Sequence, residues 1–241
     1  MTAILALAGN GLLLQGSVWQ ALALGQWAAV GGVLASALAW PVWPISIGLG
    51  ATIMALLQRC PDRERIPLGV FLAGLAAVTL LAANHAQASI AAAAWAEGQI
   101  YFVAGIDLVI IAVMAVVSLA ARAELTTLWL HAQAHPDIPG NRAPSLFQYS
   151  LGLSWLVVVI VLGTLTLGLP AALATLLFPA WAAAFFASDF KNLLLWTQIL
   201  ALCGFVAAWT LALALDQPFA PVLVLVNLLV TVGIRWGFLG S

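Results

Sequence analysis

The chain has 241 residues, of which 65% are hydrophobic, and it carries only 7 Lys or Arg and 8 Asp or Glu. A soluble globular domain has a charged side chain at roughly one position in four, so this composition excludes a soluble protein. Seven dispersed basic residues also exclude a basic stripe that follows the phosphates of DNA or RNA.

Long uncharged runs indicate how the chain crosses a bilayer. Residues 1–58 contain no charged side chain, nor do residues 143–188. One crossing needs about 20 residues, so each run folds back and crosses repeatedly. Lipid offers the backbone no hydrogen-bond partner, and spans that are apolar on every face are therefore helices. Turn signals predict an all-α, polytopic bundle of eight or nine transmembrane helices in a single domain over residues 1–241, with spans near 1–14, 21–40, 43–58, 66–83, 103–121, 147–165, 168–187, 192–214 and 219–238.

The basic residues predict the orientation of these spans. All seven fall at span ends that lie on the same side of the membrane. Under the positive-inside rule that side is the cytoplasm, which places the carboxy terminus inside and the amino terminus outside. These residues are Arg59, Arg63, Arg65, Arg122, Arg142, Lys191 and Arg235.

Two stretches do not fit a plain span. Residues 87–98 are Ala-rich and end near Glu97, which predicts a short helix lying in, or dipping into, the outer leaflet. Residues 123–146 form the longest polar segment and lie on the predicted cytoplasmic side. We expect a short helix there and a surface on which a soluble partner docks.

Side chains that could carry chemistry are few. His131 and His135 are four apart, the spacing of a two-histidine metal site, but no Asp, Glu or Cys completes the set locally. A solvated helix end is therefore favoured, and no metal site is predicted. The one lysine, Lys191, lacks the flanking glycines of a phosphate-binding loop. The chain cannot hydrolyse ATP alone, and we expect neither an enzyme nor a bound cofactor.

A polar side chain at membrane depth carries a free-energy cost, so functional residues are expected among such side chains. For most of them we expect only helix–helix hydrogen bonding, on the order of 1 kcal/mol each. This group comprises Gln15, Gln20, Asn84, Asp107, Gln148, Gln198 and Asn227.

Several segments resemble, in order along the chain, motifs of one family. Residues 167–182, LGLPAALATLLFPAWA, resemble the "VGALLVTALLIIPAATA" stretch of membrane subunits from the zinc/manganese/iron branch of ABC transporters. Residues 216–221 are similar to that family's "D-x-P-x-G-P" turn. Residues 98–108 resemble its "G-D-I-L…D-L" segment, with Gln99 in place of the first Asp. The residues that fall where its cytoplasmic loop begins are His135, Pro136, Asp137 and Ile138.

The departures fall on positions that the resemblance assigns to the transported ion. Near its start the family expects an Arg, then Asp-x-x-x-His, then Gly, and this chain has Gln15, Leu22, Gln26 and Gly31. The Asp and His lie one helical turn apart and are expected to hold the metal in transit. The resemblance therefore implies Leu22, Gln26 and Gln99 as substrate-path positions. A lone glutamine carbonyl is a poor ligand for Zn²⁺ or Mn²⁺, so the cargo could differ.

The resemblance implies a multi-pass subunit of an ATP-driven ABC importer in the inner membrane of a bacterial cell. Such a subunit pairs with an identical or related chain, docks cytoplasmic ATPases through a coupling loop near 123–146, and receives cargo from an extracytoplasmic solute-binding protein. The alternative is a non-transporting structural or assembly subunit of a larger membrane complex. The missing Asp and His favour this alternative.

Overall fold

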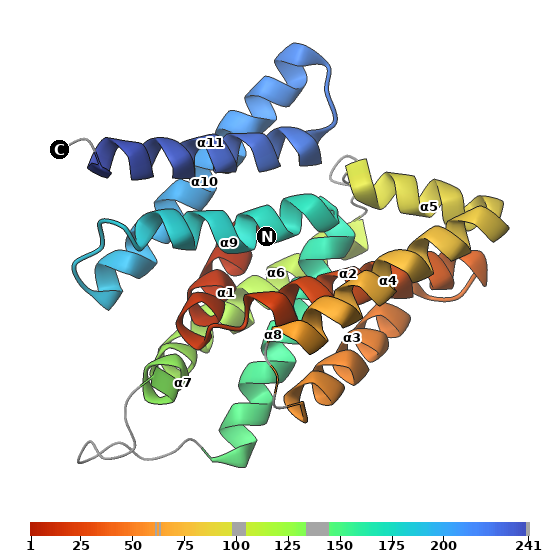
Figure 1. The fold of residues 1–241 in the computed structure, drawn as a ribbon, viewed down its shortest axis with the longest axis horizontal. Helices are drawn as coiled ribbons and strands as arrows, with labels where there is room; N and C mark the ends of the chain where they lie inside the picture. The colour runs from red at the N-terminus through yellow and green to blue at the C-terminus, as the bar shows by residue number, and fades with distance from the viewer. Residues whose placement is uncertain (61, 63, 98–104, 134–144, 240–241) are drawn as a thin grey trace.

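The computed structural model describes residues 1–60, 62, 64–97, 105–133 and 145–239. Within these ranges the chain forms eleven helices and no strand, which confirms the all-α prediction for the described residues (Figure 1). The helices are α1 (Thr2–Gln15), α2 (Val18–Ala37), α3 (Val42–Gln58), α4 (Arg65–Asn84), α5 (Ala86–Glu97), α6 (Gly105–Ala120), α7 (Arg122–Gln133), α8 (Leu146–Leu167), α9 (Leu169–Ala183), α10 (Phe190–Leu215) and α11 (Phe219–Leu239).

A helix overlaps each of the nine predicted spans, but the helices differ in length. Five of them, α2, α4, α8, α10 and α11, are long and apolar enough to cross a membrane. The pair α6 and α7, bent by 59° at its junction, would make a sixth crossing if it acts as one span. The other three, α1, α3 and α9, are apolar but have only 14, 17 and 15 residues. The count of eight or nine crossings therefore stays a prediction.

The two remaining helices fall in the stretches that do not fit a plain span. Helix α5 occupies the Ala-rich segment and packs on α2 and α4. Its Trp95 is buried, with the ring against Gly32 of α2. Helix α7 covers the first half of the long polar segment and contacts α1 and α8. A short helix is thus present in each stretch, as the sequence predicts.

Helix α2 lies at the centre of the packing and contacts α3, α4, α5, α8 and α9. Glycines let it approach several of these neighbours closely. A Cβ on Gly31 would lie 2.7 Å from the Ser46 Cα of α3, and one on Gly25 would meet side chains of α8 and α9. Helix α2 ends at Ala37, before the predicted limit of 40, because Ala39 adopts a left-handed conformation with φ 54°. Small residues are what brings membrane helices into close contact.

Helix α1 is short and almost entirely enclosed. Its 14 residues span about 21 Å at 1.5 Å per residue, less than the ~30 Å hydrocarbon core. Gly9 lies directly against the Leu176 carbonyl of α9. Asn10 accepts a hydrogen bond from the Thr197 hydroxyl of α10 at 3.0 Å, and Gln198 donates to the Ala3 carbonyl at 3.0 Å. The expectation that Gln198 joins two helices is confirmed.

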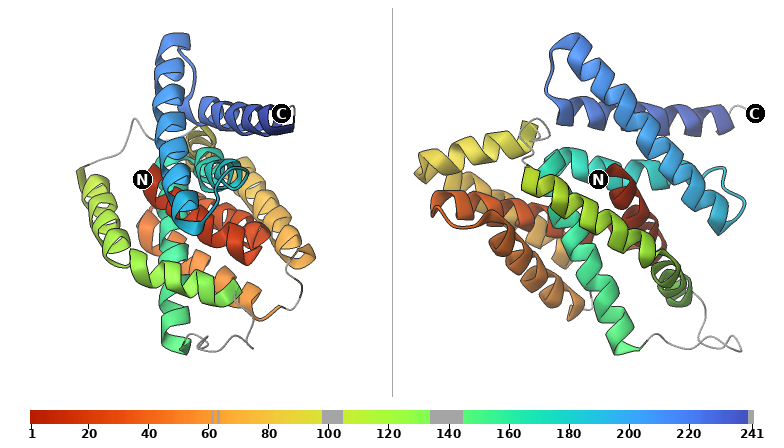
Figure 2. Two further views of the ribbon diagram at one scale, coloured as in Figure 1. Left: turned by 90° about the vertical axis from the view of Figure 1, so that its left-hand side faces the viewer. Right: turned by 180° about the vertical axis from the view of Figure 1, so that it is seen from behind.

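The helix ends that carry basic residues gather on one side of the bundle. They are the carboxyl ends of α3 and α11 and the amino ends of α4, α7 and α10, with Arg59, Arg235, Arg65, Arg122 and Lys191 respectively. In Figure 1 the carboxyl end of α11, marked C, lies at the upper left, the amino end of α10 at the left, and the linked ends of α3 and α4 toward the bottom, and Figure 2 shows the same arrangement from behind. We call this face the basic side.

Candidate functional site

Two of the three predicted substrate-path positions, Leu22 and Gln26, lie on the central helix α2. Gln26 is buried, with 2% of its surface exposed, and Leu22 is half-buried one helical turn earlier. Gln26 packs against α4 at Gly74, where an added Cβ would lie 2.8 Å from the Gln26 Cγ. The neighbouring Trp27 donates its indole N–H to the Val70 carbonyl at 2.8 Å. Helix α4 therefore covers the helix face on which Gln26 lies.

The other predicted site residues fall outside the described part of the chain. Gln99 follows α5, and the proposed coupling residues lie between α7 and α8; they are His135, Pro136, Asp137 and Ile138. The structure therefore brings together only Leu22 and Gln26 of the predicted set. Both come from the same helix, Gln26 faces α4, and neither residue lines a described cavity.

The donor set at these two positions does not suit Zn²⁺ or Mn²⁺. Leu22 offers no donor atom and Gln26 only a neutral amide, whereas these ions prefer imidazole, carboxylate or thiolate ligands. Within the described ranges, no group of three His, Cys, Asp or Glu residues could hold a metal ion. A divalent cargo would thus need ligands other than Leu22 and Gln26.

Buried hydroxyls beside α2 are polar features that sequence reasoning missed. Ser46 and Thr164 are fully buried, and their hydroxyl oxygens have no hydrogen-bond partner among the described residues. A Cβ added to Gly31 would lie 3.2 Å from the Ser46 hydroxyl oxygen. A Cβ added to Gly25 would lie 3.6 Å from the Thr164 hydroxyl oxygen. The glycines of α2 are the signal in the sequence that could have pointed to these close approaches.

At the end of the bundle opposite the basic side, an acidic residue has a defined partner. Asp107, in the first turn of α6, accepts a hydrogen bond from the Trp43 indole N–H of α3 at 3.2 Å. Asp107 belongs to one of the segments that resemble the transporter family. Its carboxylate thus ties the start of α6 to the start of α3.

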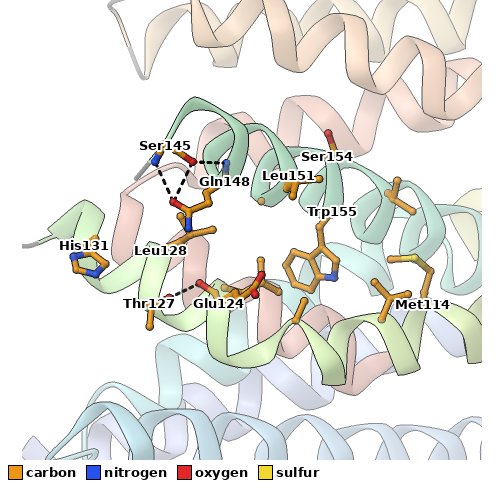
Figure 3. A pocket seen from close by; sticks show the side chains of 15 residues that line it. Met114, Glu124, Thr127, Leu128, His131, Ser145, Gln148, Leu151, Ser154 and Trp155 are labelled. Atoms are coloured by element: carbon orange, nitrogen blue, oxygen red, sulfur yellow. Dashed lines mark hydrogen bonds between the residues drawn. The ribbon is translucent and has the colours of Figure 1, made fainter. Parts of the chain in front are cut away.

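A cavity of about 770 Å³ lies between α6, α7 and α8 (Figure 3). Its inner wall is the Trp155 ring, whose indole N–H donates to the buried Ser118 hydroxyl at 2.9 Å. Near its other end, Ser145 and Gln148 form a capping box that starts α8: the Ser145 hydroxyl accepts from the Gln148 amide, and the Gln148 side chain accepts from the Ser145 N–H. The Ser-x-x-Gln pattern before an apolar run could have predicted this helix start, but no sequence pattern indicated the cavity.

Comparisons with known proteins agree over nearly the whole chain. The model of the ABC 3 transport family matches residues 6–237. The structure is similar to "PsaBC from Streptococcus pneumoniae in complex with Fab", with 17% sequence identity, a TM-score of 0.81, and coverage of 97% of this chain and 86% of that chain. It is also similar to a protein described as a metal-chelate type ABC transporter in an inward-facing conformation, with 18% identity, a TM-score of 0.64, and coverage of 98% and 85%.

The two kinds of match support different statements. No curated protein matches the sequence. The structural likenesses, at these low identities, show the fold. The family model carries the assignment, because it covers all but the first five and last four residues. The resemblance seen in the sequence is therefore confirmed: the chain belongs to the ABC 3 transport family.

Proposed function

We propose that this chain is the membrane-spanning subunit of an ATP-driven importer, with residues 1–241 forming one permease domain. The observation that carries the proposal is the family match over residues 6–237, joined to a fold that agrees over 97% of the chain with PsaBC. ATP hydrolysis belongs to partner subunits, because the sequence has no phosphate-binding loop. A second permease chain and an extracytoplasmic solute-binding protein complete the assembly.

The basic side is the cytoplasmic side in this proposal, in a bacterial inner membrane. The positive-inside rule supports it, since the described basic residues lie at helix ends on that one side. Eight or nine of the apolar helices α1–α4, α6 and α8–α11 then cross the bilayer, with the amino terminus outside. In sealed cells, a membrane-impermeant thiol reagent should not label a cysteine placed beside Arg63 or Arg142. Labelling at either position contradicts this orientation.

The ATPases dock on the segment around residues 123–146. It is the longest polar segment on the basic side, and interfaces of this kind depend on a few central residues. Replacing Pro136-Asp137-Ile138 with Gly-Ser-Gly should abolish co-purification of an ATPase while the chain still inserts. The matched control makes the same replacement at Asp216-Gln217-Pro218, on the opposite side, and should leave the ATPase bound. Unchanged co-purification of the 136–138 variant contradicts the docking assignment.

The substrate path runs along α2 and includes Leu22, Gln26 and Gln99, so the cargo is not held there as a bare divalent ion. Substituting Leu22→Asp and Gln26→His places a carboxylate and an imidazole one turn apart and should create Zn²⁺ or Mn²⁺ binding measurable by calorimetry. The unaltered chain is the control. A stoichiometric metal at this depth in the unaltered chain, or loss of folding in the double variant, removes these positions from the path.

The second candidate function is a structural or assembly subunit without transport. The observation that favours it is the donor-poor pair of Leu22 and Gln26, of which Gln26 is packed against Gly74 of α4. Purification in mild detergent, followed by identification of the co-purifying chains, separates the two functions. An ATPase and a solute-binding protein in the complex support the importer. A complex without any ATPase supports the structural subunit.

A further inference from the structure

Helix α7 is open on one side and closely packed on another. On the open side, Glu124, Thr127 and His131 line the cavity of about 770 Å³ (Figure 3). On the packed side Trp129 is buried, with 6% of its surface exposed, and the space between α7, α1 and α8 there measures about 30 Å³. Closely packed side chains have low compressibility and transmit a displacement, whereas an open cavity takes it up. A movement of α7 is therefore transmitted on the side of Trp129.

Trp129 contacts α1 at Gly11, where the missing side chain lets the indole ring lie against the helix. A Cβ added to Gly11 would lie 2.4 Å from Cε2 and 2.7 Å from Nε1 of this ring, so even alanine there would displace it. The same ring contacts the Trp155 ring of α8, with 6.1 Å between the ring centres. A Cβ added to Gly152 of α8 would lie 3.4 Å from the Leu128 Cδ1, an ordinary van der Waals distance. Of these two glycines that face α7, Gly11 therefore makes the closer contact.

Helix α1 is joined to α9 and α10 in the same turn that contacts α7. Gly9 lies directly against the Leu176 carbonyl of α9. Asn10, the residue before Gly11, is fully buried and accepts a hydrogen bond from the Thr197 hydroxyl of α10 at 3.0 Å. Both contacts lie within two residues of Gly11, so a shift of this turn acts on α9 and α10 as well.

Most of helix α7 belongs to the segment 123–146, which docks the ATPases in the proposed importer, and the inference rests on that function. We infer that Trp129 is a positioning residue for transport, which transmits the movement of docked ATPases from α7 to α1 and thereby to α9 and α10. Because Trp129 is buried, a protein bound at the surface does not touch it. A change at Gly11 should therefore weaken the transmission and leave docking intact.

The test observes the far end of α1 in the complex purified with its ATPase. Ala3 is exposed there, and its carbonyl accepts a hydrogen bond from Gln198 of α10 at 3.0 Å. Ala3→Cys serves as the reporter, and its rate of labelling by a maleimide is measured with and without the non-hydrolysable ATP analogue AMP-PNP. A complex without this substitution gives the background from Cys60 and Cys203. With Gly11 in place we expect the analogue to change the labelling rate about fivefold or more, at the lower end of allosteric coupling.

Two substitutions alter the contact, and the ATPase should still co-purify with both variants. Gly11→Ala displaces the ring and Trp129→Phe makes it smaller, so either should reduce the response to AMP-PNP to about twofold or less. Together they should restore it to about threefold or more, because the smaller ring leaves room for the new methyl group. Gly152→Ala is the matched control on α8 and should keep the full response. A residue that only stabilises the fold would change the melting temperature and not the response.

Defined outcomes overturn the inference. An unchanged response in both Gly11→Ala and Trp129→Phe overturns it, and so does an equal loss of response in Gly152→Ala. The same holds if the complex with Gly11 in place gives no response, or if Gly11→Ala releases the ATPase. In all these cases the importer proposal stands. A purified complex of the unaltered chain that contains no ATPase overturns the importer proposal and this inference together.

Discussion

Helices α2 and α4 are both 20 residues long and pack against each other. Their relation between hydropathy and burial is the opposite of the one found in soluble proteins. Helix α2 is the less apolar, with a mean hydropathy of 1.3, and 72% of it is buried. Helix α4 has a mean hydropathy of 2.3, and only 11% of it is buried. In water the more apolar helix would be the buried one. Here the more apolar of the two helices faces outward, as a lipid solvent allows.

The difference teaches that apolarity alone does not decide which of these two helices is buried. Lipid tails are as apolar as leucine, so no hydrophobic force drives a leucine inward. Close packing supplies the attraction, and α2 accordingly places Gly25, Gly31 and Gly32 against its neighbours. Helix α4 exposes Leu72 and Leu75, and its Gly69 has open space around it.

The largest effect should come from enlarging a glycine of α2. Gly31→Leu forces a side chain against the Ser46 backbone, which cannot move as a flexible side chain can, and should cost about 3 kcal/mol or more. Gly69→Leu on α4 has nothing within 4 Å of its Cβ and should change stability little. Thermal unfolding in detergent, followed by size-exclusion fluorescence, measures both. Similar melting temperatures for the two variants would contradict the idea that α2 is the more closely packed helix at its glycines.

A charge in the middle of α4 should have the next largest effect. Leu75 is 48% exposed and lies at the centre of the helix. In water Leu75→Lys would be nearly neutral, but at the centre of a membrane helix a lysine costs roughly 2.5–3.5 kcal/mol. The yield of inserted protein reports this cost, and Leu75→Met is the control that keeps the side chain apolar. Full insertion of the lysine variant would show that this face meets water.

The smallest effect concerns two threonines of α10. Thr197 is buried, and its hydroxyl lies 3.0 Å from the Asn10 side-chain oxygen of α1 and 2.7 Å from the Leu193 carbonyl, whereas Thr210 is exposed and donates to the Ala207 carbonyl of its own helix at 2.9 Å. Thr197→Val should lower stability by about 1 kcal/mol, and Thr210→Val by less than about 0.5 kcal/mol. Chemical unfolding in detergent micelles compares them. A larger loss for Thr210→Val than for Thr197→Val would locate the polar contact between helices elsewhere.

The sequence predicts the helices well because the residues that begin and end each helix lie next to it in the chain. Runs of apolar residues between Pro41, Pro218 and the charged cluster after Arg59 give helix ends within a few residues, and the Ala-rich and polar stretches give α5 and α7. Where boundaries differ, a single backbone conformation decides, as at Ala39 after α2. The family resemblance was readable for the same reason, since its motifs are short and keep their order.

Contacts between distant residues were not predictable from one sequence. Nothing around Gln26 indicates that Gly74 will lie against it, and nothing around Trp155 indicates the Ser118 hydroxyl. The cavity needs three helices and a bend between two of them, so no local pattern encodes it. Polar residues at membrane depth give candidates, but their partners follow only from the packing.

The enclosure of α1 has a consequence for the order in which the molecule is made. The hydrogen bond that Asn10 accepts from Thr197 joins residues 187 positions apart, and Gly9 lies against α9. At a synthesis rate of roughly 5–20 residues per second, Thr197 emerges about 10–40 s after Asn10. Helix α1 therefore cannot complete its contacts with α9 and α10 until those helices have been made. During that interval the Asn10 side-chain oxygen lacks the Thr197 hydroxyl from which it accepts a hydrogen bond in the folded chain.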